Sequence, residues 1–194
     1  MKQAYIFIGR SGCGKGTQAK LLIDELKKQG EDVFSLETGS KFREFIKGET
    51  YSNRLAKEIT DQGGLQPEFL AVFIWAKEIV GNLKEGDILV LDGVARKILE
   101  AKLLNSVFDF LGYKRPVVIF MNVSRKWSEE RMLGRGRTDD DVQEIKRRLD
   151  WYETEVEPVV EWYKGNSEYN FLDINGEQTV EEVHQEIMSK LGFT

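Results

Sequence analysis

GRSGCGKGT, residues Gly9–Thr17, is the stretch that decides the fold of this chain. It follows an apolar run, Ala4–Ile8, and precedes a segment from about residue 16 to residue 28 whose apolar residues recur at helical spacing. Glycine residues let successive backbone N–H groups turn toward an anion, and the helix N-terminus adds partial positive charge. Lys15 adds a point charge suited to phosphates, and the hydroxyl of Thr17 can help to order Mg²⁺. The stretch is therefore predicted to be a phosphate-binding P-loop.

Length and composition indicate one acidic globular domain. The 194 residues carry a formal net charge of −5, with 28 Lys and Arg residues against 33 Asp and Glu residues. Such a chain lacks the basic surface that nucleic-acid binding favours, and no apolar run approaches the length of a membrane span. Cys13 is the single cysteine, which excludes an intrachain disulfide and favours a reducing compartment. We therefore expect a cytoplasmic monomer with no nucleic-acid and no membrane partner.

Apolar runs alternate with helical patterns along the whole chain. Five runs read as buried strands: Ala4–Ile8, Val33–Leu36, Ile88–Leu91, Val117–Met121 and Phe171–Ile174. This alternation predicts an α/β fold, a five-stranded parallel sheet flanked by helices on both faces. Ligands of such folds bind at the carboxyl ends of the strands. We expect four sites to share that edge: Gly9, Glu37–Thr38, Asp92 and Asn122.

Two further helices have readable ends. A long helix is predicted to begin near residue 138, with Thr138 or Asp139 as its N-cap. Pro158 is expected to kink this helix because proline lacks a backbone N–H. The final helix is predicted to start at Thr179, where Glu182 completes a capping box.

Arginine residues follow the ends of several predicted elements. A planar guanidinium group suits bidentate contact with phosphate and keeps its charge. A single arginine is ordinarily a solvated surface charge, but these lie after strand ends and beside a glycine-interrupted turn at residues 134–137. The sequence therefore predicts that the arginines bind phosphate groups together. The set is Arg43, Arg96, Arg131, Arg135, Arg137 and Arg148.

Several motifs in register resemble the nucleoside monophosphate kinases, the adenylate kinase family most of all. They run from about residue 4 to about residue 191 in the order of that family. The matching segments are Gly9–Gln18, Glu37–Arg43, Gly64–Glu68, Asp92–Arg96, Arg131–Arg135, Arg137–Asp140 and Lys146–Leu149. In the general P-loop motif a Ser or Thr follows the lysine; the family pattern G-K-G-T-Q accounts for Gly16 at that place and Thr17 after it.

The resemblance implies a P-loop kinase that binds ATP, a nucleoside monophosphate and Mg²⁺. Its parts would be a core of residues 1–37, 68–131 and 138–194, a helical monophosphate-binding flap of residues 38–67, and a rudimentary lid of residues 132–137.

Roles are implied residue by residue. ATP would contact Gly12, Cys13, Gly14, Lys15, Gly16, Thr17, Arg131, Arg135, Asn175 and Gly176. The monophosphate would contact Thr38, Gly39, Arg43, Gly64, Leu65, Gly93, Arg96, Glu100, Arg137 and Arg148. The implied catalytic set is Lys15, Arg96, Arg131, Arg135, Arg137 and Arg148. Thr17 and Asp92 would hold Mg²⁺ through water.

The lid segment departs from the family pattern, because only Gly136 separates Arg135 from Arg137. Such a short lid is expected to shield the transferring phosphoryl group less well, so we predict more ATP hydrolysis without acceptor than in lid-bearing relatives.

Glu100 departs as well, since it stands where adenylate kinases have a glutamine. A carboxylate only accepts hydrogen bonds, which suits guanine better than adenine. The flap as a whole resembles the AMP-binding type, so AMP is favoured, and GMP, CMP and UMP remain alternatives. Two other classes also remain open: a non-catalytic nucleotide sensor, and a P-loop kinase that acts on a small metabolite.

Overall fold

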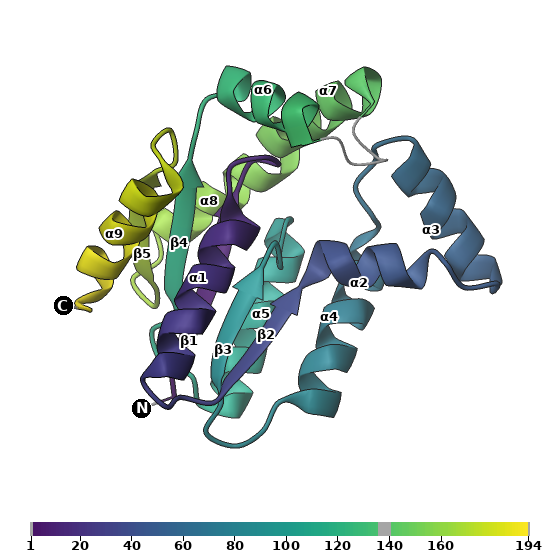
Figure 1. Ribbon diagram of the computed structural model, residues 1–194. Coiled ribbons are helices and arrows are strands. Elements are labelled where there is room, and N and C mark those ends of the chain that lie inside the picture. Colours follow the sequence, from purple (N-terminus) through teal and green to yellow (C-terminus); the bar gives the residue numbers. More distant parts are fainter. Residues whose placement is uncertain (1, 136–140, 194) are drawn as a thin grey trace.

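The chain folds around one parallel sheet. The computed structural model describes residues 2–135 and 141–193. The strand order is β2-β3-β1-β4-β5, and every pair is parallel (Figure 1). The strands are β1 (Ala4–Gly9), β2 (Val33–Glu37), β3 (Ile88–Asp92), β4 (Val117–Asn122) and β5 (Asn170–Asn175). The predicted α/β class and five-stranded parallel sheet are confirmed.

Helices cover both faces of the sheet, and each face has its own apolar cluster. The helices α1 (Lys15–Lys28) and α9 (Val180–Leu191) pack on one face, where Phe7 of β1 points. The helices α4 (Glu68–Asn82), α5 (Ile98–Leu111) and α8 (Glu157–Lys164) pack on the other face, where Ile6 points. Successive strand residues alternate between faces, so an uninterrupted apolar run is required to fill both clusters.

The flap, residues 38–67, consists of two helices outside the sheet layers. These are α2 (Thr38–Phe45) and α3 (Tyr51–Asp61), and α3 begins with a capping box between Thr50 and Asn53. A separate small apolar cluster joins the flap to α4, with Phe42 and Ala56 packed against Ile74. The segment expected to be the flap thus consists of two helices that share one small apolar cluster with α4.

The C-terminal third differs from prediction in how its long helix begins. Residues 136–140 lie outside the described ranges, and α7 (Val142–Trp151) has Asp141 as its N-cap, whose Oδ1 accepts a hydrogen bond from the backbone N–H of Gln143 at 2.8 Å. The expected cap at Thr138 or Asp139 was therefore wrong. Asp141 has the same capping chemistry and lies directly before the first helical residue, Val142.

Pro158, at which a kink was expected, lies just after an irregular turn in the same helical stretch. A π-helical turn, η1 (Tyr152–Val156), separates α7 from α8, and Pro158 then falls in the first turn of α8. A first turn tolerates proline because its N–H groups have no intrahelical partner. The widened turn thus lets the chain stay helical through the proline.

The predicted lid begins inside a helix. Residues 132–135 form the last turn of α6 (Arg125–Arg135), where Met132 is fully buried against Ile145 and Leu149 of α7. The rest of the predicted lid lies outside the described residues. Within the described ranges, no helix combines the length and the apolar character needed to cross a membrane.

Candidate functional site

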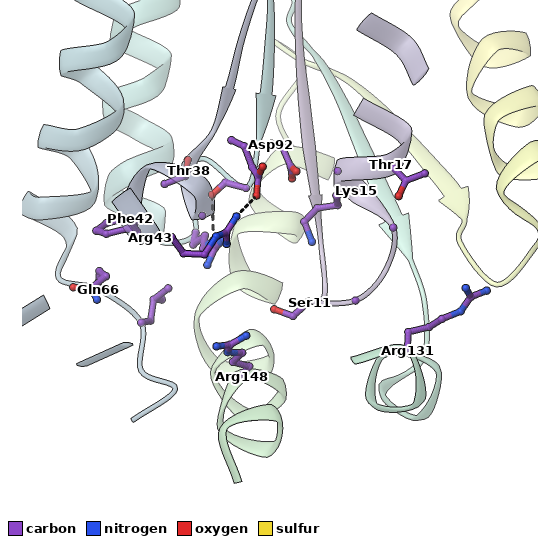
Figure 2. Close-up of a pocket in the computed structure, with 18 of the residues that line it drawn as sticks. Ser11, Lys15, Thr17, Thr38, Phe42, Arg43, Gln66, Asp92, Arg131 and Arg148 are labelled. Carbon is purple, nitrogen blue, oxygen red and sulfur yellow. Dashed lines mark hydrogen bonds and ion pairs between the residues drawn. The ribbon is translucent and has the colours of Figure 1, made fainter. Parts of the chain in front are cut away.

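A large cleft of about 1220 Å³ opens at the carboxyl ends of β1, β2 and β3. Its walls come from the P-loop, the flap, α6 and α7, and these segments are distant in sequence. Figure 2 shows Lys15 and Arg43 facing this space from the P-loop and from α2, with Arg148 beyond them on α7. The predicted site residues that line it are Gly12, Gly14, Lys15, Gly16, Thr17, Thr38, Gly39, Arg43, Gly64, Leu65, Asp92, Gly93, Arg96, Glu100, Arg131 and Arg148.

The P-loop has the expected tight turn before α1. Gly12 has φ of +84°, and a Cβ added there would lie 2.8 Å from Cγ of Met132, so this position requires glycine. Lys15 Nζ donates hydrogen bonds to the carbonyl oxygens of Gly9, at 2.9 Å, and Arg10, at 2.7 Å. These bonds hold the ammonium group over the loop. The Cys13 side chain is buried in the apolar cluster below the loop, with its Sγ 3.4 Å from Lys15 Nζ, and Cys13 does not line the cleft.

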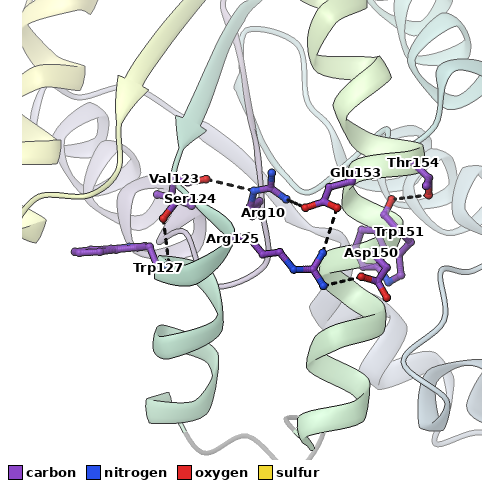
Figure 3. Close-up of polar contacts among 9 residues, drawn as sticks. All are labelled: Arg10, Val123, Ser124, Arg125, Trp127, Asp150, Trp151, Glu153 and Thr154. Carbon is purple, nitrogen blue, oxygen red and sulfur yellow. Dashed lines mark hydrogen bonds and ion pairs between the residues drawn. The ribbon is translucent and has the colours of Figure 1, made fainter.

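A second tie fixes the P-loop to the helix beyond the lid (Figure 3). The Arg10 guanidinium donates to the carbonyl oxygen of Val123 at 3.3 Å, pairs with Glu153 at 3.2 Å and lies 4.2 Å above the centre of the Tyr152 ring. Arg125 joins the same network through Glu153, at 3.2 Å, and Asp150, at 2.6 Å. The loop and the π-helical turn are thereby held as one body.

Asp92 supplies a carboxylate beside the start of α1. A Cβ added at Gly16 would lie 3.2 Å from Asp92 Oδ2, so this carboxylate lies directly against the P-loop. Thr17, in the first turn of α1, lines the same cleft. Hydroxyl and carboxylate oxygens are hard ligands of the kind that Mg²⁺ prefers, and Mg²⁺ takes few protein ligands when phosphates and water complete its shell. The donor chemistry of Thr17 and Asp92 thus fits a metal held through water.

Two arginines form the opposite end of the cleft. Arg43 pairs with Glu37 at 2.8 Å, and Arg96 Nε donates to the carbonyl oxygen of Gly93 at 3.1 Å. Gly93 has φ of +68°, and a Cβ there would lie 3.0 Å from a guanidinium nitrogen of Arg96. Burial lowers the pKa of the Arg96 guanidinium, against the opposing charges of Asp92 and Glu100. Arginine nevertheless stays charged at neutral pH, so Arg96 is a desolvated cation aimed at the cleft.

Glu100 lies next to Arg96, in the first turn of α5. Its residue is 3% exposed, and Oε2 accepts a hydrogen bond from the backbone N–H of Arg96 at 3.1 Å. Burial raises the pKa of the Glu100 carboxyl, while the Arg96 backbone N–H and guanidinium oppose that shift. Glu100 thus lines the cleft at the end where Arg96 lies.

Several predicted site residues do not point into the cleft, do not line it, or lie outside the described residues. Arg131 lines the cleft, but its guanidinium lies 4.7 Å above the Trp127 ring (Figure 2 shows it apart from Lys15). Asn175 and Gly176 are absent from the described cleft wall; the Gly176 N–H instead donates to the carbonyl oxygen of Asn122 at 2.9 Å, behind the P-loop. The side chain of Arg135 and all of Arg137 lie outside the described residues.

One functional contact is missing from the prediction. Trp151 of α7 lines the cleft, and its Nε1 donates to the carbonyl oxygen of Gly63 in the flap at 3.1 Å. Arg147 donates to the adjacent carbonyl oxygen of Gln62 at 2.7 Å. The Arg96 guanidinium lies 5.6 Å from the centre of the Trp151 ring, within cation–π range. Only the i, i+4 spacing of Arg147 and Trp151 was visible in the sequence, and that spacing does not identify a partner in the flap.

The amino-acid sequence of this chain was compared with family models and with known proteins, and it is similar to proteins of one family. The family model described as "Adenylate kinase" matches residues 7–168. A protein named adenylate kinase from Prochlorococcus marinus is 34% identical over 191 residues, which cover 98% of this chain and 100% of that protein. An adenylate kinase from Corynebacterium urealyticum is 34% identical over 96% of this chain and 97% of its own length. Adenylate kinase 1 from a Nostoc species is 31% identical over 96% and 97% of the two lengths.

Proposed function

This chain belongs to the adenylate kinase family, and we propose that its cleft transfers the γ-phosphoryl group of MgATP to AMP, giving two ADP in a reversible reaction. The observation that carries the proposal is the placement of cations at both ends of one cleft. Lys15 stands at the end formed by the P-loop, and Arg43 and Arg96 stand at the end formed by the flap and β3. Two phosphorylated ligands can therefore meet end to end between them.

The chemistry needs positioning and charge neutralisation more than proton transfer. An oxygen of the AMP phosphate attacks the γ-phosphorus, the bond from that phosphorus to the bridging oxygen of ATP breaks, and the electron pair leaves with ADP. The attacking phosphate is already an anion at neutral pH, so no general base is required. Fixed cations that face the transferred group stabilise its transition state. We assign this role to Lys15, Arg96 and Arg148. On the family pattern we extend it to Arg131, which also lines the cleft, and to Arg135 and Arg137.

Mg²⁺ is part of the proposal. Thr17 and Asp92 would hold it through water, with the remaining ligands supplied by nucleotide phosphates. The metal would neutralise charge on the β- and γ-phosphates when bound. Among the described residues no cluster of three or more His, Cys, Asp or Glu side chains is positioned to hold a metal. This is in keeping with a metal that arrives with its nucleotide.

A panel of acceptors tests the proposed function. ATP is incubated with AMP, GMP, CMP, UMP or a hydroxyl-bearing acid such as shikimate or gluconate, and ADP formation is followed in a coupled assay with and without excess chelator. We expect AMP to be the best acceptor and chelation to abolish turnover. Turnover with the hydroxyl-bearing acid but with none of the monophosphates would indicate a metabolite kinase. ATP binding without turnover on any acceptor would indicate a nucleotide sensor.

Trp151→Phe tests the contact between α7 and the flap. Phenylalanine keeps an aromatic ring beside Arg96 but removes the hydrogen bond to Gly63, which is worth about 1 kcal/mol. We expect the KM for AMP to rise about fivefold, the equivalent of that energy. ATP hydrolysis without acceptor is expected to increase too, because a loosened flap admits water. The same exchange at Trp162, which packs on Tyr169 away from the cleft, is the control. An unchanged KM and an unchanged hydrolysis rate for Trp151→Phe would contradict the assignment.

A further inference from the structure

We propose that Glu100 binds the base of AMP as a neutral carboxylic acid, so that AMP binding is accompanied by proton uptake wherever Glu100 is ionised in the free protein. The inference rests on the proposed function, because it takes AMP as the acceptor. Glu100 differs from the family pattern, and its side chain is buried beside the backbone and the guanidinium of Arg96.

The position of the carboxyl group limits its exchange with water. Glu100 is 3% exposed yet lines the cleft, in company with two other buried polar residues, Thr38 and Gln66. Oε2 of Glu100 accepts a hydrogen bond from the Arg96 backbone N–H, which leaves one lone pair on that oxygen and the whole of Oε1 for a ligand. A base bound against this group would complete its desolvation.

The charges near Glu100 do not neutralise it fully. Burial is the largest influence on its pKa and raises it; the N–H and guanidinium of Arg96 and the ammonium of Lys97 oppose this, while Glu68 at the start of α4 adds to it. Tyr163 of α8 also faces the group, and its own pKa is raised well above the ordinary value, so it stays neutral. The Arg96 guanidinium acts on Glu100 through its charge, while its Nε donates a hydrogen bond to the carbonyl oxygen of Gly93.

Hydrogen-bond complementarity then decides the protonation state with AMP bound. The Watson–Crick edge of adenine offers an acceptor at N1 and a donor at the exocyclic amino group. A neutral carboxyl group presents the matching pair, an O–H donor and a carbonyl acceptor, as a glutamine amide does. An ionised carboxylate would set a lone pair against N1 in a desolvated site, which is costly. The bound pair is therefore expected to share one proton between Glu100 and N1.

The direction of the pH effect follows from this. A carboxyl with a raised pKa holds its proton to higher pH than an exposed one, and the protonated fraction falls as the pH rises through that pKa. AMP binding should weaken in the same range, by up to about tenfold per pH unit. GMP should respond in the opposite sense, because N1–H and the amino group of guanine both donate and an ionised carboxylate accepts from both.

Glu100→Gln is the matched variant, since glutamine keeps the size and the donor–acceptor pair but cannot titrate. The KM for AMP is measured at intervals from about pH 6 to about pH 9 for both proteins, because the burial of Glu100 raises its pKa. Titration of the AMP phosphate affects both proteins alike and cancels in the ratio of their KM values. We expect this ratio, wild type over variant, to rise with pH. In Glu68→Gln the KM for AMP should still rise with pH, but at lower pH, because the charge of Glu68 helps to raise the pKa of Glu100.

Calorimetry gives an independent readout. AMP binding is measured in two buffers of different ionisation enthalpy at a pH where the ratio of KM values has begun to rise. Wild type is expected to take up more protons than Glu100→Gln. A flat ratio of KM values together with equal proton uptake, in proteins that both use AMP, would overturn the inference and leave the proposed function intact. If neither protein used AMP at any pH, the proposed function would fail first and this inference with it.

Discussion

Lys15→Met is expected to lower the rate of ADP formation from ATP and AMP by about 10³-fold, as loss of a principal cation on a transferred phosphoryl group does in comparable sites. The Lys15 ammonium is held over the P-loop by the carbonyl oxygens of Gly9 and Arg10. Its charge is therefore already placed at the loop, and a neutral side chain of similar length leaves the charge developed in the transition state unmatched. Steady-state kinetics with both substrates at saturation measure the effect.

Lys27→Met is the control for this prediction. Lys27 is exposed in the last turn of the same helix, so it carries the same charge without facing the cleft. Its loss should leave turnover within about twofold of wild type, since exposed charges contribute little beyond their immediate surroundings. A Lys15→Met enzyme that retained more than a tenth of wild-type turnover would contradict the assigned role.

Arg96→Lys is expected to cost about 10²- to 10³-fold in kcat/KM for AMP, although the charge is kept, because lysine cannot make a bidentate contact with phosphate. The Arg96 guanidinium is oriented by the bond from Nε to the carbonyl oxygen of Gly93 and by the Trp151 ring. A flexible ammonium group has neither constraint. The loss should appear mainly with AMP as the varied substrate, while the KM for ATP changes little.

Stability measurements separate this effect from damage to the fold. Burial lowers the pKa of the Arg96 guanidinium, because a charged group is less stable in the protein interior than in water. Burying this cation therefore costs the folded protein stability. Arg96→Met should therefore be as thermostable as wild type or more so, while being inactive. Arg54→Lys, an exposed arginine of α3, is the control for the Arg-to-Lys exchange. Near-normal AMP kinetics for Arg96→Lys would contradict its place at the acceptor phosphate.

Local patterns account for what could be predicted from sequence. The five strands and the P-loop follow from uninterrupted apolar runs and from glycine spacing, both of which are properties of short segments. The shared edge of Gly9, Glu37 and Asp92 then follows from the rules of parallel sheets, and Glu37 does pair with Asp92 in the register of β2 and β3. The capping box at Thr179 is confirmed for the same reason, since its bonds span three residues.

Contacts between distant segments were not predictable. Trp151 meets the carbonyl oxygen of Gly63 across 88 positions, and Arg10 meets Glu153 across 143. A side chain that donates to a backbone carbonyl leaves no signal at the carbonyl's position, because every residue has one. The burial of Glu100 belongs to the same class: the residue type was visible as a departure from the family, but its desolvation depends on how α5 sits against the sheet.

The account stands on two nucleotides that meet end to end between cations from separate parts of the chain. A crystal structure with a bisubstrate analogue, two adenosines joined by five phosphates, tests this most directly. We predict one set of phosphates against the P-loop and Lys15, the other against Arg43 and Arg96, and one adenine beside Glu100. An analogue bound with its phosphate chain away from either Lys15 or Arg96 would contradict the account.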